Sequence, residues 1–179
     1  MSLPLTAAQR TLWSALQRYP DVPVYDMPFV LALGTVDEDR FLRAFERLVA
    51  DVEALRTVFE PTGPSQRVLP TLDAELPVLD VDDASGWGTA RAASHQLGPA
   101  RTFDSALLRL PDGSHAWYIC QLHLLTDGWS VLVLWERLRA LYAGDTTQPA
   151  PSWSTHVLRT AEPVERARRQ DGLVVEHRR

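Results

Sequence analysis

One stretch of the sequence combines residue types that can do acid–base chemistry, residues 121–130 (QLHLLTDGWS). His123 stands at the end of an apolar run, and Asp127 and Gly128 follow four and five residues later. A neutral imidazole can accept a proton from a reacting amine or hydroxyl, and a glycine lets a ligand or another backbone approach closely. A structural interpretation is equally open at this point. His123 is then a hydrogen-bonded strand-end residue, and Asp127 is a helix N-cap worth about 1 kcal/mol.

The elements on either side predict how this stretch is placed. Residues 105–110 and 115–122 flank the turn sequence Pro111-Asp112-Gly113-Ser114, so we expect a β-hairpin that ends at His123. A strong helix then begins at Asp127 and closes near Gly144. The hairpin therefore places His123 at the rim of a sheet, where a cleft can reach it.

The rest of the chain predicts a mixture of helices and strands. Thr6 and Gln9 have capping-box spacing before a helix that Pro20 ends, and Asp37 can cap a second helix. Further strands are expected at 25–33, 55–59, 66–69 and 78–81, with a weaker helix at 85–97. Because several strands are joined by turns and not by helices, we predict an α+β fold, a two-layer sandwich with a mixed sheet and helices packed on one face.

The six tryptophans divide into two groups. Trp13, Trp117, Trp129 and Trp135 lie on predicted elements and are expected in the core, whereas Trp87 and Trp153 lie in weaker segments and are candidates to face a partner.

Composition narrows the function classes. The chain has 179 residues, 45% of them hydrophobic, a formal net charge of −5 and one cysteine, Cys120. This argues against a nucleic-acid or anionic-membrane binder, which needs a basic face. We find no membrane span, no signal peptide and no metal-ligand spacing. With a single cysteine that is expected to be a small buried residue, a cytoplasmic location is predicted.

Three segments in order resemble motifs of the condensation domains of nonribosomal peptide synthetases. Residues 123–130 resemble the HHxxxDGWS motif, residues 5–13 (LTAAQRTLW) an opening motif of the form (S/T)xAQxRxW, and residues 53–59 (EALRTVF) the second half of RHExLRTxF. The resemblance covers about residues 5–145 and implies a fold like that of chloramphenicol acetyltransferase. It divides the chain into an N-terminal condensation lobe, residues 1–150, and an Arg-rich helical or linker tail, residues 151–179.

The sequence also departs from these motifs. Leu122 stands where the first histidine of the pair belongs, and Asp51 and Val52 stand where the Arg and His of RHExLRTxF belong. The second histidine, which the resemblance implies is catalytic, is kept as His123. Leu122 is then expected to repack the strand, and Arg56 is expected to pair with Asp127 and fix the turn that carries His123.

The resemblance implies acyl transfer. An amine acceptor on one carrier protein would attack a thioester donor on the 4′-phosphopantetheine arm of another. His123 would accept or orient the amine proton, and a hydrogen-bond donor near the Gly128 backbone would stabilise the oxyanion. No cofactor bound by the chain itself is expected. Three hypotheses remain open: one lobe of an enzyme that needs a second, C-terminal lobe; a degenerate lobe that docks carrier proteins or other synthetase subunits; and an acyltransferase completed by self-association. Each leaves an apolar surface exposed, expected at the sheet edge.

Overall fold

The computed structural model describes residues 2–19, 25–60, 63–94, 97–147, 150 and 152–160. Seven strands form two sheets, ordered β2-β7-β6-β5 and β1-β4-β3. The strands are β1 (Leu3–Pro4), β2 (Asp26–Gly34), β3 (Thr57–Phe59), β4 (Ser65–Val68), β5 (Val78–Asp80), β6 (Phe103–Arg109) and β7 (His115–Leu122). The helices are α1 (Ala7–Arg18), α2 (Glu38–Asp51), the short 3₁₀ helix η1 (Glu53–Arg56), α3 (Ala84–Ser94) and α4 (Gly128–Ala143), followed by a helix over residues 153–160.

The predicted hairpin is the centre of the larger sheet. β6 and β7 pair antiparallel around a turn in which Gly113 has a φ of 80°, a value that favours glycine. β2 pairs antiparallel with the other side of β7, and β5 pairs parallel with β6, so the sheet is mixed as expected. This arrangement confirms the predicted α+β fold class.

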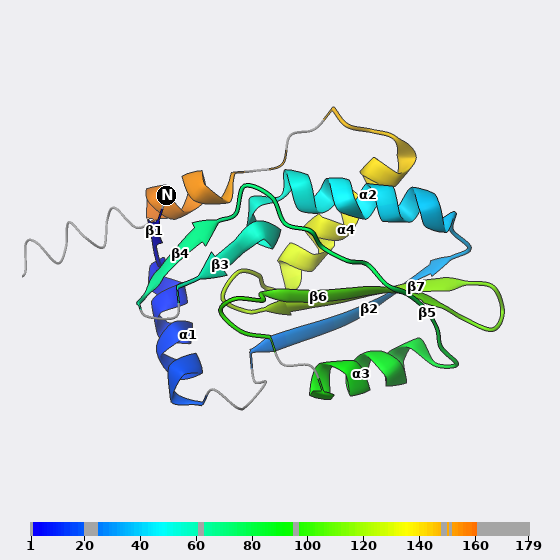
Figure 1. Ribbon diagram of the computed structural model, residues 1–179, viewed down its shortest axis with the longest axis horizontal. Helices are drawn as coiled ribbons and strands as arrows, with labels where there is room; N and C mark the ends of the chain where they lie inside the picture. The colour runs from blue at the N-terminus through cyan, green and yellow to red at the C-terminus, as the bar shows by residue number, and fades with distance from the viewer. Residues whose placement is uncertain are drawn as a thin grey trace, which may run out of the picture.

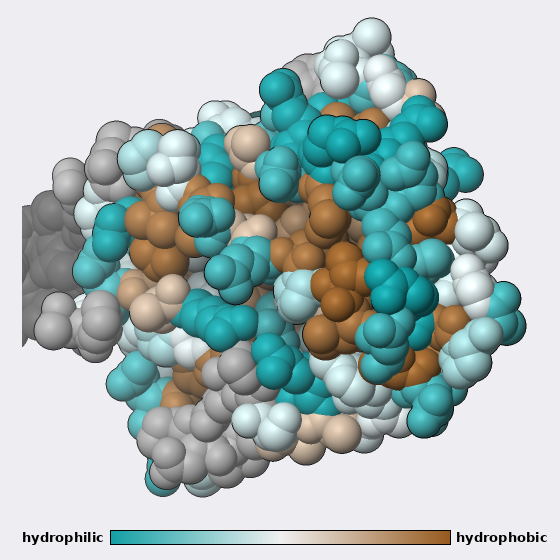
Figure 2. Space-filling view, turned by 45° about the vertical axis from the view of Figure 1, so that its right-hand side comes forward, coloured by the Kyte–Doolittle hydropathy of each residue, from teal (hydrophilic) through white to brown (hydrophobic). Residues whose placement is uncertain are grey.

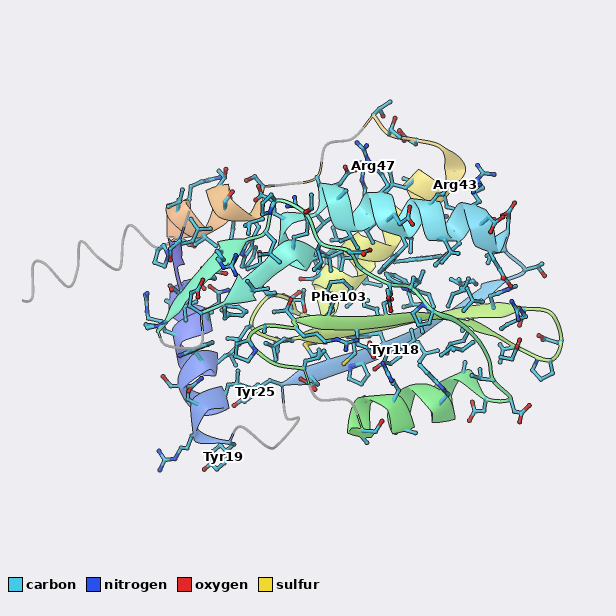
Figure 3. All side chains as sticks on the ribbon, viewed as in Figure 1. Tyr19, Tyr25, Arg43, Arg47, Phe103 and Tyr118 are labelled. Carbon is cyan, nitrogen blue, oxygen red and sulfur yellow. The ribbon has the colours of Figure 1, made fainter. Side chains whose placement is uncertain are left out.

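The helices nevertheless cover both faces of this sheet, which corrects the expectation that they pack on one face. Every residue of β7 is buried. Trp117 and Ile119 face the core beneath α2 and α4, whereas Tyr118 and Cys120 face the core formed with α1 and α3. Figure 1 shows α3 on the side of the sheet away from α2, and Figure 3 shows Phe103 and Tyr118 on opposite sides. A strand that is apolar on both faces needs cover on both.

Local capping signals fix the helix ends. The capping box of Thr6 and Gln9 is present at the start of α1, and the Asp37 side chain accepts a hydrogen bond from the Arg40 N–H at the start of α2. α4 ends at Gly144, which is in the left-handed conformation that closes helices.

Two expectations differ from the structure. The strand predicted from Leu55 begins as η1 and becomes extended only at Thr57. Trp129 is 73% exposed and not in the core, because the first turns of α4 face the sheet with Val131 and Leu134 instead. Trp87 and Trp153 are both half-buried against the core, and their contact with a partner stays a prediction. Of the tail predicted over 151–179, the part beyond residue 160 lies outside the described residues.

Within the part of the chain that the structure describes, no helix combines the length and hydropathy that crossing a bilayer requires.

Candidate active site

His123 lies in the first position after β7, in a turn that runs to Thr126. Its backbone N–H donates to the Tyr25 carbonyl at 2.8 Å, and its Nδ1 lies 2.7 Å from the Thr126 carbonyl oxygen. A carbonyl oxygen can only accept, so Nδ1 must carry the hydrogen of this contact. In the neutral imidazole Nε2 then holds the lone pair, and the half-buried ring can use it to take up a proton.

The turn that carries His123 is anchored on the protein interior. Leu124 and Leu125 bury their side chains in the core between α1 and the larger sheet. The Leu125 N–H donates to the Leu122 carbonyl at 3.0 Å, and the Leu124 carbonyl accepts from the Gln9 side chain at 2.9 Å. The position of His123 is therefore set by α1 as well as by β7.

Asp127 begins α4 and confirms the N-cap interpretation. Its Oδ1 accepts hydrogen bonds from the Ser130 N–H at 2.8 Å and the Ser130 hydroxyl at 2.7 Å. These two bonds lower the pKa of the Asp127 carboxyl, and the nearby His123 contributes a smaller effect in the same direction. The ionised cap holds the end of the His123 turn on the helix.

Gly128 follows the cap and is exposed. Apart from its own helix and chain neighbours, no heavy atom of the described residues lies within 4 Å of where a Cβ would be. Nothing inside the described part of the protein therefore requires a glycine here, and the space in front of its backbone is open to an approaching molecule.

Arg56 does not pair with Asp127, so this expectation was wrong. None of the ion pairs among the described residues joins them, and the Arg56 guanidinium instead donates to the backbone carbonyls of Val49, Leu69 and Pro70. Because Arg56 is the last residue of η1 and not part of an extended strand, its side chain points to the end of α2. Arg56 thus supports the junction of α2, η1 and the loop after β4.

The residues that depart from the motifs have packing roles. Leu122 is completely buried in the core beneath α1 and α3, as expected for a residue that repacks the strand. Asp51 forms ion pairs with Arg47, on the outer side of α2 (Figure 3), and with Arg137 of α4, both at 2.8 Å. An acidic residue at position 51 thus links α2 to α4.

One other reactive side chain, Cys120, is accounted for by its burial. Cys120 is buried, and this burial raises the pKa of its thiol to about 12, so it is no thiolate nucleophile at neutral pH. No group of three or more potential metal-ligating side chains occurs among the described residues.

The sequence and the fold of this chain are similar to those of known proteins. A condensation-domain family model matches residues 1–171. The isonitrile lipopeptide synthase of Mycobacterium tuberculosis is 34% identical over 168 residues, which are 86% of this chain and 6% of that protein.

Solved structures agree with this match. The starter condensation domain of the rhizomide synthetase RzmA is 27% identical with a TM-score of 0.70, over 85% of this chain and 40% of that one. The condensation domain of the monacolin K polyketide synthase MokA, at 18% identity, shows the same fold with a TM-score of 0.83 over 98% of this chain and 42% of that one. The chain spans well under half of these proteins, and with the family model matching nearly its whole length it belongs to the condensation-domain family of nonribosomal peptide synthetases.

Proposed function

We propose that this chain supplies the histidine-bearing lobe of a site that joins a carrier-tethered acyl or aminoacyl thioester to an amine. The observation that carries the proposal is the 2.7 Å contact between His123 Nδ1 and the Thr126 carbonyl. It fixes the tautomer in which Nε2 is the basic nitrogen, and the ring is partly exposed at the end of a sheet. A purely structural histidine would not need to keep its second nitrogen accessible.

In the proposed reaction His123 carries a proton from the attacking amine to the leaving sulfur. The amine nitrogen attacks the thioester carbon while Nε2 takes the amine proton. The C–N bond then forms, the C–S bond breaks, and the proton passes to the sulfur of the phosphopantetheine arm, which leaves as a thiol. Such general base catalysis is typically worth about 10²–10⁴-fold. Because the thioester is already activated, aligning the two tethered substrates contributes about 7–11 kcal/mol in the best cases.

The open backbone at Gly128 supports a place for the substrate beside His123. No described side chain fills the space where a Cβ would stand. The first backbone N–H groups of a helix have no partner further back in the helix. Since the Ser130 N–H is bonded to Asp127, those of Gly128 and Trp129 are the ones that can donate to an oxyanion that forms at the thioester carbon.

A second lobe is part of the proposal because the first turns of α4 are apolar on their outer side. Trp129, Leu132 and Val133 are exposed there, while Val131 and Leu134 face the core. Figure 2 shows hydrophobic side chains reaching the surface between hydrophilic ones, which is ordinary when they are scattered. Helix α4 differs because its exposed apolar residues are three and four positions apart and so lie together on one side of its first two turns. Exposed apolar side chains that gather in one place mark a surface that another molecule covers. This apolar surface lies on a helix and not at the predicted sheet edge.

The test measures product formation from loaded donor and acceptor carrier proteins. The assay contains this chain either alone or together with a C-terminal condensation lobe. We expect product only with both halves, and a loss of about 10²-fold or more with His123→Ala. The control is Arg43→Ala, which truncates an exposed side chain of α2. Undiminished product with His123→Ala would exclude His123 from the chemistry and favour a lobe that only docks carrier proteins.

A further inference from the structure

Two buried glutamines form a hydrogen-bonded pair that contacts the turn carrying His123. Gln9 of α1 is 3% exposed and Gln66 of β4 is completely buried. The Gln9 Nε2 donates to the Leu124 carbonyl at 2.9 Å and to Gln66 Oε1 at 3.1 Å. The Gln66 Nε2 donates to Gln9 Oε1 at 2.8 Å and to the Pro4 carbonyl at 2.9 Å.

The remaining oxygen positions of both amides are also occupied. Gln9 Oε1 accepts a second hydrogen bond from the Thr6 N–H at 2.9 Å, and Gln66 Oε1 accepts one from the Trp153 indole N–H at 3.1 Å. Each amide group can donate two hydrogen bonds and accept two. Here both do so, which makes the pair a closed network with no donor or acceptor left over.

This closure fixes the direction of the pair. Turning either amide over would set its NH₂ group against other donors and its oxygen against the carbonyls of Leu124 or Pro4, and unmade hydrogen bonds are costly in a buried place. The Gln9 NH₂ group is therefore held pointing at the Leu124 carbonyl. Apolar packing of the Leu124 side chain alone would not orient that carbonyl, since packing has no direction.

We propose that the Gln9–Gln66 pair positions His123 for proton transfer, a role that rests on the function proposed for His123 above. Leu124 directly follows His123, and its carbonyl belongs to the peptide plane that joins it to Leu125, within the turn between His123 and Thr126. When Gln9 holds that plane, the Thr126 carbonyl stays within reach of Nδ1 and Nε2 remains the basic nitrogen. Trp153 closes the network from the helix over residues 153–160, so that helix contributes to the same alignment.

The test separates positioning from ordinary stability. Gln9→Met keeps the length of the side chain and removes every amide hydrogen bond, including the half of the capping box that Gln9 provides. The matched control is Thr6→Ala, which removes the other half of the box, the hydroxyl that accepts from the Gln9 N–H, and leaves the Gln9 amide in place. Both variants weaken the start of α1, but only Gln9→Met releases the Leu124 carbonyl.

The readout is the ¹⁵N chemical shifts of the two His123 ring nitrogens in the full chain, measured where the imidazole is neutral. We expect wild type and Thr6→Ala to show the form with hydrogen on Nδ1, and Gln9→Met to add a substantial population with hydrogen on Nε2. Folded Gln9→Met with unchanged shifts would overturn the proposal. If Gln9→Met does not fold, Trp153→Phe decides in its place. It removes the indole donor from Gln66 and keeps an aromatic ring at this position. A smaller shift in the same direction is expected, and an unchanged spectrum overturns the proposal.

A kinetic measurement adds an independent test in the carrier assay. Gln9→Met should lower kcat roughly tenfold or more with little change in KM, because misplacing a catalytic group costs alignment and not binding. Unchanged kcat in a variant with altered nitrogen shifts would contradict the functional role. Full activity of His123→Ala would instead contradict the function proposed for His123. The nitrogen shifts of wild type and Gln9→Met would not change with that result, so the two failures are distinguishable.

Discussion

His123 and Leu122 are sequence neighbours with opposite environments. Successive side chains of a strand point to opposite faces. Leu122 is the last residue of β7 and is completely buried, whereas His123 lies just beyond the strand and is half-buried. Only the second position of the pair reaches the surface of the described structure. Loss of the first histidine of the family motif therefore leaves the reactive position intact.

Restoring that first histidine should destabilise this protein. In Leu122→His an imidazole would replace a leucine in a site lined by apolar side chains, such as Cys120, Leu124 and Leu125. We expect the free energy of unfolding to fall by about 1–3 kcal/mol for the buried polar group alone, measured by urea unfolding followed by tryptophan fluorescence. His123→Leu is the matched control, with a smaller expected change because position 123 is half-buried. Equal or greater stability of Leu122→His would show that the core around β7 can satisfy an imidazole.

At the scale of elements, interactions within a few residues could be predicted from sequence and distant ones could not. The capping box at Thr6, the N-cap at Asp127 and the hairpin around Gly113 depend on residues three or four apart, and the structure has all of them. The partners of Arg56 could not be predicted, because they depend on the chain forming η1 before β3. Gln66 was missed for a similar reason, since it lies 57 residues from Gln9 and gives no local signal.

The junction of α2 with the hairpin contains an ionic cluster that should make stability depend on pH. Glu38, in the first turn of α2, accepts two hydrogen bonds from Arg109 of β6, at 2.8 and 2.9 Å, and lies 3.0 Å from His115 Nε2 of β7. Arg109 also pairs with Asp80 of β5. The hydrogen bonds from Arg109, and then that from His115, lower the pKa of Glu38 from 4.5 to about 2.

A lowered carboxyl pKa stabilises the folded state only while the group is ionised. The contribution of Glu38 is therefore fully present above its unfolded pKa of 4.5 and is lost as the pH falls toward 2. We expect wild type to be more stable than Glu38→Gln at neutral pH, and the difference to shrink across that acidic window, as measured by urea unfolding at a series of pH values. Glu136→Gln is the control, because among the described residues Glu136 pairs only with Arg139, at the surface. A Glu38→Gln difference that stays constant across the acidic window would contradict the argument.

At the scale of the whole molecule, the described core is closed on both faces of the larger sheet but α4 is not covered on its outer side. Two buried clusters fill the interior, one toward α1 and α3 and one toward α2 and α4. The exposed large hydrophobic residues of the described chain are Tyr19, Trp129, Leu132, Val133 and Leu158. Three of these five lie on the first two turns of α4, next to the His123 turn. Since the chain spans about 40% of the RzmA and MokA condensation domains, we expect a second lobe to cover this surface.

Leu132→Gln combined with Val133→Gln tests that expectation. Both side chains are already 50% exposed, so the double variant should unfold at nearly the same urea concentration as wild type. Burying each one completely against a partner is worth up to about 1.5–3 kcal/mol relative to full exposure, and every 1.4 kcal/mol is tenfold in affinity. We therefore expect the Kd for a C-terminal condensation lobe, measured by isothermal titration calorimetry, to rise about tenfold or more.

Arg43→Ala, on the outer side of α2, is the control and should leave the Kd unchanged (Figure 3). Equal affinity of the double variant would place the second lobe elsewhere. A concentration-dependent dimer of wild type that the double variant abolishes would instead identify a second copy of this chain as the partner of α4.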